Sequence, residues 1–155
     1  MRVRLIAIGT RMPEWVETAV ADYAGRLPRE LKLEVVELPL EPRGKNADIP
    51  RLKQAEGERL LKAAGSARRI VLDERGSAWS SAELAQRLER WKQDGRDLAW
   101  LVGGPDGHAP EVLAQAEAQW SLSRLTLPHP LVRVLLAEQL YRAWSLGAHH
   151  PYHRA

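Results

Sequence analysis

Two turns rich in glycine or proline have the residue types best suited to hold a ligand. Gly103-Gly-Pro-Asp-Gly107 follows the apolar run Leu98–Val102, and Leu125-Thr-Leu-Pro-His-Pro130 separates a Leu- and Ser-rich run from an amphipathic helix. Glycine lets a backbone approach a ligand closely, and the two flanking prolines fix the direction of His129. Backbone N–H and C=O groups in such turns can read the edge of an adenine without charged side chains.

Each turn also has a purely structural interpretation. Gly103–Gly107 could be an ordinary βα turn, because it has neither the G-x-G-x-x-G spacing of a dinucleotide-binding loop nor a Gly-Lys-Ser/Thr phosphate-binding motif. Pro105 also lacks the N–H that a phosphate cradle would use there. His129 could equally be a structural histidine that caps its turn instead of facing a substrate.

The last helix carries two arginines that could act on a substrate. Arg133 and Arg142 are nine residues apart, which at 3.6 residues per turn places them on opposite sides of the helix. They therefore cannot both face one surface of the same subunit. We expect one of them to be solvated or to contact another subunit.

The C-terminal segment His149-His-Pro-Tyr-His-Arg154 has three interpretations. A metal site is disfavoured because the chain has no cysteine and Pro151 prevents a helical pair of histidines. A frayed terminus is a common alternative. The third interpretation is an RNA contact, in which Tyr152 stacks on a base and Arg154 pairs with a phosphate.

A basic loop, Arg43-Gly-Lys-Asn46 with Arg51 and Lys53 beyond it, is a candidate for contacts with RNA phosphates. Most runs of this kind are simply solvated, and both interpretations stay open. The net charge of the whole chain is only +3, so charge permits nucleic-acid binding and does not establish it.

Apolar periodicity predicts that strands and helices alternate along the chain. Ser80 and Glu83 form a candidate capping box, and Gly65 and Gly95 are plausible helix stops. The expected strands are 3–8, 31–38, 69–73, 98–102 and 121–125, and the expected helices are 14–27, 49–64, 81–93, 110–118 and one that starts near 130. This order indicates an α/β fold with a mainly parallel sheet flanked by helices. Ligands of such sheets bind beyond the carboxyl ends of the strands, which adds the loop after Leu72 to the two turns.

Composition sets the broad class of the protein. The 155 residues are 45% hydrophobic and 28% charged, which suits one globular domain spanning 1–155. Without cysteine, neither a disulfide framework nor a thiolate metal site is possible. No run reaches the roughly 18 apolar residues of a membrane span, and we expect no signal peptide, no membrane partner and a cytoplasmic location.

Taken together, these segments resemble the RlmH family of SPOUT methyltransferases. The resemblance rests on the two turns, on Arg43-Gly-Lys-Asn-Ala-Asp48, on Trp91-Lys-Gln-Asp-Gly-Arg96 and on the tail, and it covers essentially the full chain. It implies a SPOUT-type α/β knot with a C-terminal trefoil knot, a homodimer, and S-adenosylmethionine as the cofactor. It also implies methylation of N3 of a pseudouridine in large-subunit (23S) ribosomal RNA on the assembled ribosome.

The resemblance also assigns residues to a site without a metal. The cofactor is implied to lie against Leu72, Gly103, Gly104, Ser123, Arg124, Leu125, Thr126, Leu127 and Pro128. The substrate side is implied to include His129, Arg133, Arg142, Tyr152, His153 and Arg154. His129 or a tail residue could accept the N3 proton, and the arginines could stabilise the negative charge that develops on the base.

Two other classes of function remain open at this point. A nucleotide-binding α/β domain with another activity would bind a dinucleotide and not S-adenosylmethionine. A non-catalytic ribosome-binding protein would bind ribosomes and transfer no methyl group. The presence of both the Gly-Gly-Pro turn and the Leu-Thr-Leu-Pro-His-Pro turn favours the methyltransferase.

Overall fold

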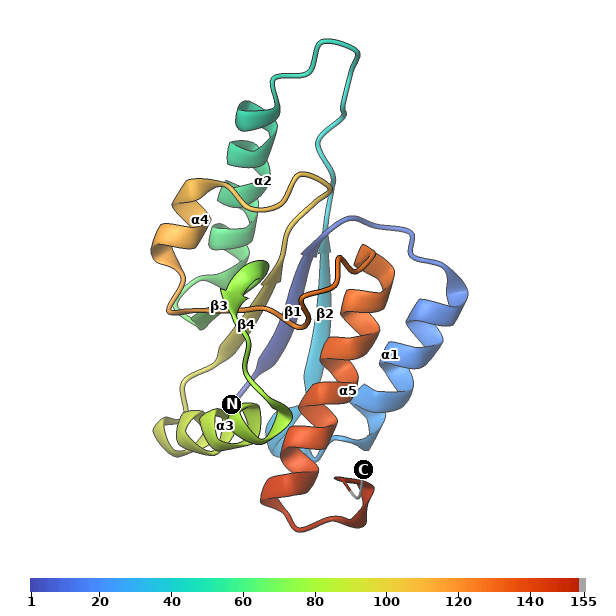
Figure 1. Cartoon of the computed structure of the whole chain (residues 1–155), viewed down its shortest axis with the longest axis vertical. Helices are drawn as coiled ribbons and strands as arrows, with labels where there is room; N and C mark the ends of the chain where they lie inside the picture. The colour runs from blue at the N-terminus through green and yellow to red at the C-terminus, as the bar shows by residue number, and fades with distance from the viewer. Residues whose placement is uncertain (154–155) are drawn as a thin grey trace.

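The protein is built on a five-stranded parallel sheet with strand order β2-β1-β4-β3-β5, seen in a computed structural model that describes residues 1–153 (Figure 1). All four strand pairings are parallel. The strands are β1 (Val3–Ile8), β2 (Leu33–Leu38), β3 (Arg68–Ser77), β4 (Leu98–Val102) and β5 (Ala118–Trp120). The α/β class and the parallel sheet predicted from the sequence are confirmed.

Helices cover both faces of this sheet. One face carries α1 (Glu14–Arg26), α3 (Ser81–Asp94) and α5 (His129–Gly147), and the other carries α2 (Ile49–Ala64) and α4 (Pro110–Gln115) (Figure 1). Short 3-10 turns lie at Arg29–Leu31 and Pro151–His153. Alternation along β1 explains the two layers, because Leu5 and Ala7 pack on one side while Ile6 and Ile8 pack on the other.

A cluster of tryptophans forms the centre of the larger core. Trp100 of β4 is fully buried, with Trp91 of α3 and Trp120 of β5 at ring-centroid distances of 5.9 and 5.7 Å. Trp79 stacks on Trp120 at 5.4 Å. These contacts join α3 to β4 and to the edge strand β5, and so fix the strand that leads into the Leu-Thr-Leu-Pro-His-Pro turn.

The boundaries of four elements differ from the prediction. β5 is Ala118–Trp120 and not 121–125, because residues 118–120 pair with Ile70–Leu72 and the strand pairing ends at Trp120. α4 accordingly ends at Gln115, and β3 continues to Ser77 through an irregularity in its pairing with β5. The expected start of β2 is taken by a 3-10 turn up to Leu31.

The helix ends follow their capping residues. The Ser80 hydroxyl accepts a hydrogen bond from the Glu83 N–H at 3.1 Å, and Gly95 ends α3 with a left-handed φ of +73°. The Asp48 carboxylate caps α2 in the same way, by accepting from the Arg51 N–H. The capping serine and the helix stops at Gly65 and Gly95 are therefore confirmed.

The chain crosses the carboxyl edge of the sheet between β5 and α5. β5 lies at the edge beside β3, whereas α5 packs against α1 and α3, so residues 121–128 span the distance between them. The C-terminal trefoil knot stays a prediction. Within residues 1–153, no helix combines the length and the apolar character that crossing a membrane requires.

Candidate functional site

A cleft of about 940 Å³ lies beyond the carboxyl ends of the strands, which point toward the top of Figure 1. Segments that follow β1, β3, β4 and β5 line it. Of the predicted cofactor residues, the structure brings together Leu72, Gly103, Gly104, Ser123, Leu125, Thr126 and Leu127 along its walls. Arg124 is exposed and does not line the cleft, and Pro128 precedes α5 as its N-cap.

The Gly103–Gly107 turn is a tight backbone structure. The Gly107 N–H donates to the Gly104 carbonyl at 3.0 Å, and Gly107 has a φ of +82°, which favours glycine. A Cβ on Gly103 would lie 3.0 Å from the carbonyl of Gly107. A Cβ on Gly104 would lie 3.0 Å from Glu56 Oε1, so the glycine there serves packing against α2 as well as access to the cleft.

His108 follows this turn and supports the end of β3. Its Nε2 lies 3.1 Å from the Leu72 carbonyl oxygen, and its side chain is almost completely buried. Burial lowers the pKa of His108, although its hydrogen bond to the Leu72 carbonyl opposes that effect. A neutral imidazole thus holds the Leu72 backbone at the cleft wall.

Asp73 is the next residue on this wall. Burial tends to raise the pKa of Asp73, but the backbone N–H of Arg75, which donates to Oδ1 at 2.8 Å, and the Arg75 guanidinium outweigh it. The pKa of Asp73 is therefore below its ordinary value, and the cleft carries a carboxylate beside Leu72.

His129 lines the cleft from the start of α5, and protein groups engage its ring. Its Nε2 accepts from Arg133 Nε at 2.9 Å, and its ring lies near the backbone of Gly103. Burial is the main cause that lowers the pKa of His129, and the neighbouring Arg133 cation adds to it. His129 is accordingly neutral near pH 7 and links α5 to the Gly103–Gly107 turn.

Arg133 lies behind His129 and does not line the cleft. Its guanidinium is buried, with 3% of the side chain exposed, and it donates to Glu37 Oε2 at 2.5 Å and to the Gly9 carbonyl at 2.9 Å. These contacts join the ends of β1 and β2 to α5. The resemblance implied that Arg133 lies on the substrate side of the cleft. In the structure its position on the helix turns its side chain toward the sheet instead.

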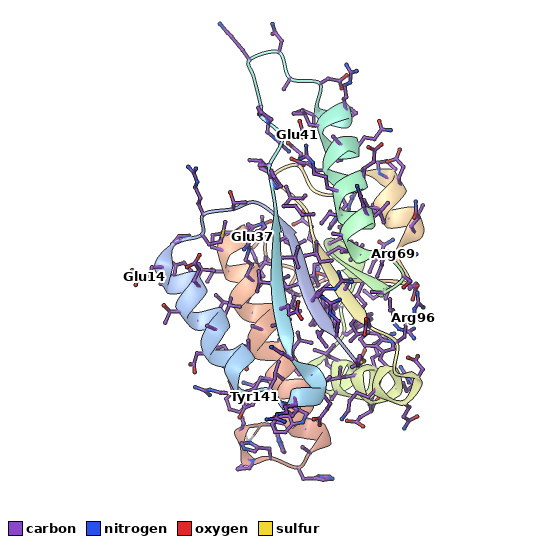
Figure 2. The ribbon with its side chains drawn as sticks, turned by 180° about the vertical axis from the view of Figure 1, so that it is seen from behind. Glu14, Glu37, Glu41, Arg69, Arg96 and Tyr141 are labelled. Atoms are coloured by element: carbon purple, nitrogen blue, oxygen red, sulfur yellow. The ribbon has the colours of Figure 1, made fainter. Side chains whose placement is uncertain are left out.

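Arg142, Tyr152 and His153 lie at the other end of α5 and do not line the cleft. At 1.5 Å per residue, Arg142 is about 20 Å along the helix from His129. In Figure 2, Glu37 and Tyr141 mark these two ends. Arg154 lies outside the described residues.

The tail is ordered around an aromatic and charged cluster. Tyr152 packs on Tyr141 at a centroid distance of 4.5 Å, and its hydroxyl donates to Glu138 Oε1 at 3.1 Å. Arg142 Nε donates to the same oxygen at 2.8 Å. Burial raises the pKa of Tyr152, as does a hydrogen bond to Tyr23. The frayed-terminus interpretation is thus wrong for residues 151–153. Within residues 1–153, no three His, Asp or Glu side chains lie close enough together to hold a metal ion.

Charged residues of both signs line the cleft, since Asp73, Glu74 and Asp106 lie among the lining residues beside two cations. Lys53 and Arg75 line it, Arg11 lies between the lining residues Thr10 and Met12, and Arg124 lies between Ser123 and Leu125. Arg11 is exposed and has a φ of +59°, an unusual conformation for a residue with a side chain. In contrast, Arg43 of the basic loop is paired with Glu56 and Asp106, so it does not present a free charge to a phosphate.

Sequence reasoning missed the Gly9–Met12 segment, His108 and Glu37. Gly9–Met12 follows β1 at the same edge of the sheet as the predicted loops, so the rule of ligand binding beyond parallel strands could have found it. No local pattern marks His108 or Glu37, because their partners Leu72 and Arg133 lie far away in the sequence.

The family of the chain follows from its sequence profile. The profile of the family described as Predicted SPOUT methyltransferase matches residues 1–153. The chain belongs to the SPOUT methyltransferase family. A methyltransferase activity and the SPOUT fold are therefore properties of the family that this chain shares.

Solved structures agree with the SPOUT fold. A probable methylase family protein from Haemophilus influenzae Rd KW20 has a TM-score of 0.58 at 13% identity, over 99% of this chain and 70% of that one. A putative methylase family protein from Neisseria gonorrhoeae has a TM-score of 0.54 at 13% identity, over 90% and 81%. A third structure, described for 2-OH methylation of C/U34 on tRNA, has a TM-score of 0.51 at 18% identity, over 96% and 98%.

Proposed function

We propose that this SPOUT protein is an S-adenosylmethionine-dependent methyltransferase of the RlmH type, which methylates N3 of a pseudouridine in 23S ribosomal RNA on the assembled ribosome. The observation that carries the proposal is a cleft that gathers most of the predicted cofactor residues and His129 at one edge of the sheet. Lys53 and Arg75, which line this cleft, are cations that can contact RNA phosphates. The proposed location is the cytoplasm.

The residues of the cleft fit the proposed cofactor. Methyltransferases of this family generally use S-adenosylmethionine. Apolar walls at Leu72, Val102 and Leu127 suit an adenine, and the exposed backbone of the Gly103–Gly107 turn offers hydrogen-bonding groups without a large side chain in the way. When bound there, the cofactor supplies an electrophilic methyl group that a nucleophilic nitrogen can accept as the N3 proton leaves.

The chain's own residues supply position more than acid–base chemistry. His129 is held neutral by burial, and its hydrogen bond with Arg133 holds it at the start of α5 near the Gly103 backbone. This engagement makes His129 a positioning residue in the proposal. The N3 proton is then left to solvent or to a group of the tail, where the Glu138 carboxylate lies between Arg142 and Tyr152.

A homodimer would bring that tail to the cleft. Within one subunit the tail lies at the far end of α5, so the proposal requires the tail of the partner subunit. Trp15 and Leu131, which are 52% and 39% exposed near the starts of the neighbouring helices α1 and α5, are large apolar side chains that a second copy can cover.

The decisive experiment is transfer of a labelled methyl group from S-adenosylmethionine to ribosomes that lack the modification, followed by mapping of the labelled nucleotide. We expect label in one pseudouridine of 23S RNA, and less label in the isolated hairpin than in intact ribosomes. Label in another RNA overturns the substrate. Ribosome binding without transfer indicates a non-catalytic protein, and affinity for a dinucleotide in place of S-adenosylmethionine indicates another nucleotide-binding domain.

A further inference from the structure

The loop between β2 and α2, residues 39–48, is tied to α2 by two arginines. Arg43 Nη1 contacts Glu56 Oε2 at 2.5 Å, and Arg43 Nη2 donates to Glu56 Oε1 at 3.1 Å. Arg59 forms a second tie, since it donates to the Pro39 carbonyl at 2.8 Å and pairs with Glu41. Figure 2 places Glu41 between this loop and α2.

Arg43 differs from Arg59 because it also reaches the Gly103–Gly107 turn. Its Nε and Nη2 lie 3.1 and 3.0 Å from Asp106 Oδ2. The Arg43 guanidinium therefore joins α2 to Asp106, which is 63 residues from Arg43 in the sequence. A planar group with several donors suits this double contact, which a lysine ammonium cannot reproduce in the same geometry.

The two carboxylates that Arg43 contacts differ in burial. The Glu56 side chain is only 3% exposed, so its charge requires compensation, and the backbone N–H of Glu41 donates to it as well, at 3.0 Å. The Asp106 side chain is 34% exposed. Arg43 is thus anchored on Glu56, and its contact with Asp106 is the part that can open.

The two segments joined by Arg43 are neighbours in the lining of the same cleft. Leu40 of the 39–48 loop lines it, and so does the whole Gly103–Gly107 turn. The turn also rests on the cluster directly, because a Cβ on Gly104 would lie 3.0 Å from Glu56 Oε1 and 3.3 Å from Leu40 Cδ1. The position of the turn against the loop and α2 is therefore tied to Arg43, Glu56 and Asp106.

We propose that Arg43 and Asp106 form a clasp that holds the Gly103–Gly107 turn in the shape that binds the cofactor. Arg43 is a positioning residue in this view, since it acts on the ligand through the turn and does not touch it. The inference rests on the proposed function of the cleft as an S-adenosylmethionine site. The proposal also changes the interpretation of the basic loop. Arg43 of this loop contributes to cofactor binding and not to RNA binding.

The test compares Asp106→Asn and Arg43→Lys with the matched control Arg59→Gln. Asp106→Asn removes the charge of the more exposed carboxylate and leaves the Arg43–Glu56 pair in place. Arg59→Gln removes a tie between the same loop and the same helix that does not reach the turn. Calorimetry with S-adenosylmethionine should show a Kd raised about tenfold for Asp106→Asn and changed less than about twofold for Arg59→Gln.

Three further measurements separate positioning from general stability. The thermal midpoint of Asp106→Asn should equal that of the wild type, and its methyl transfer should show a raised KM for S-adenosylmethionine with kcat retained. The double variant Arg43→Lys/Asp106→Asn should bind no more weakly than the poorer single variant, because both changes break one contact. Hydrogen exchange at the Gly107 amide should be faster in both single variants.

The outcomes distinguish this inference from the proposed function. An unchanged Kd in Asp106→Asn, or additive losses in the double variant, overturns the clasp while cofactor binding by the wild type stands. A wild type that binds no S-adenosylmethionine overturns the proposed function instead. In that case hydrogen exchange alone tests the clasp. An unaltered exchange rate of the Gly107 amide in Asp106→Asn then rejects it.

Discussion

Arg133 shows how one side chain can connect three parts of the fold. It contacts Glu37 near the end of β2, the Gly9 carbonyl after β1 and His129 at the start of α5. Each of these segments ends at or borders the cleft. A buried guanidinium with three acceptors therefore serves the site by holding its frame, although it does not face a ligand.

We predict that Arg133→Leu lowers the free energy of unfolding by about 2–3 kcal/mol, because Glu37 and the Gly9 carbonyl lose their partner. This loss of unfolding free energy is smaller than for a fully buried ion pair, because Glu37 is partly exposed. Urea denaturation measures it. In Glu37→Gln/Arg133→Leu the two losses should not add, and full additivity would show that the pair is not coupled.

His108, which is buried, and His129, which is half-buried, predict a dependence of stability on pH. Burial is the first cause that lowers the pKa values of His108 and His129 below the ordinary 6.5. The unfolded state then binds more protons, so this part of the stability is complete above pH 6.5 and is lost as the pH falls below it. His108→Gln/His129→Gln should lose less unfolding free energy than the wild type between pH 7.5 and pH 5, roughly the range of histidine titration. Identical losses in the two proteins would contradict this.

At the scale of elements, the site depends on how β5 is placed against β3. Gly76 of β3 lies where a Cβ would be 2.7–2.8 Å from the backbone of Gln119 and Trp120. The Ser121 N–H donates to the Ser77 carbonyl at 2.9 Å directly after this contact. Close approach of the two backbones thus sets the point at which the chain leaves the sheet and enters the cofactor turn.

Gly76→Ala should therefore destabilise the protein by about 2 kcal/mol, because the added methyl group meets backbone atoms that cannot move independently. It should also weaken binding of S-adenosylmethionine, since residues 122–127 follow the displaced strand. Gly44→Ala is the matched control, as nothing lies within 4 Å of its Cβ position. Equal thermal midpoints for the two variants would show that β5 tolerates the shift.

At the scale of the whole molecule, the cleft and the tail lie at opposite ends of α5 (Figure 1). A cleft that used its own tail would need a rearrangement of the Tyr141, Tyr152 and Glu138 cluster. A two-fold dimer removes this requirement, because it can place the tail of one subunit beside the cleft of the other.

We predict that two inactive variants complement each other. Thr126→Trp is designed to obstruct the cleft at an exposed lining position, and a chain that ends at Gly147 lacks the tail. Gly104 is a poorer choice, because a side chain there would also press on Glu56. Random mixing makes half of the dimers mixed with one working site each, so about a quarter of wild-type activity should return. Confirmed heterodimers without activity would show that each site is built within one subunit.

Local spacing in the sequence was sufficient to predict most of the elements. The alternating strands and helices, Ser80 as a cap, and the glycine stops depend on neighbouring residues, and they match the structure. The position of three turns at one sheet edge follows from the same pattern, because parallel strands end together. β5 was misplaced because its register depends on packing against β3 and on Gly76, which no local pattern contains.

Only the tertiary structure decided what the charged residues do. Arg133 and Arg142 have the same residue type on one helix, yet one is buried beside Glu37 and the other lies in the tail cluster. Arg43 belonged to a basic run in the sequence, but in the fold it bridges Glu56 and Asp106. Backbone periodicity is a property of neighbours in the chain, whereas the partner of a charge is chosen by the packing of elements far apart in sequence.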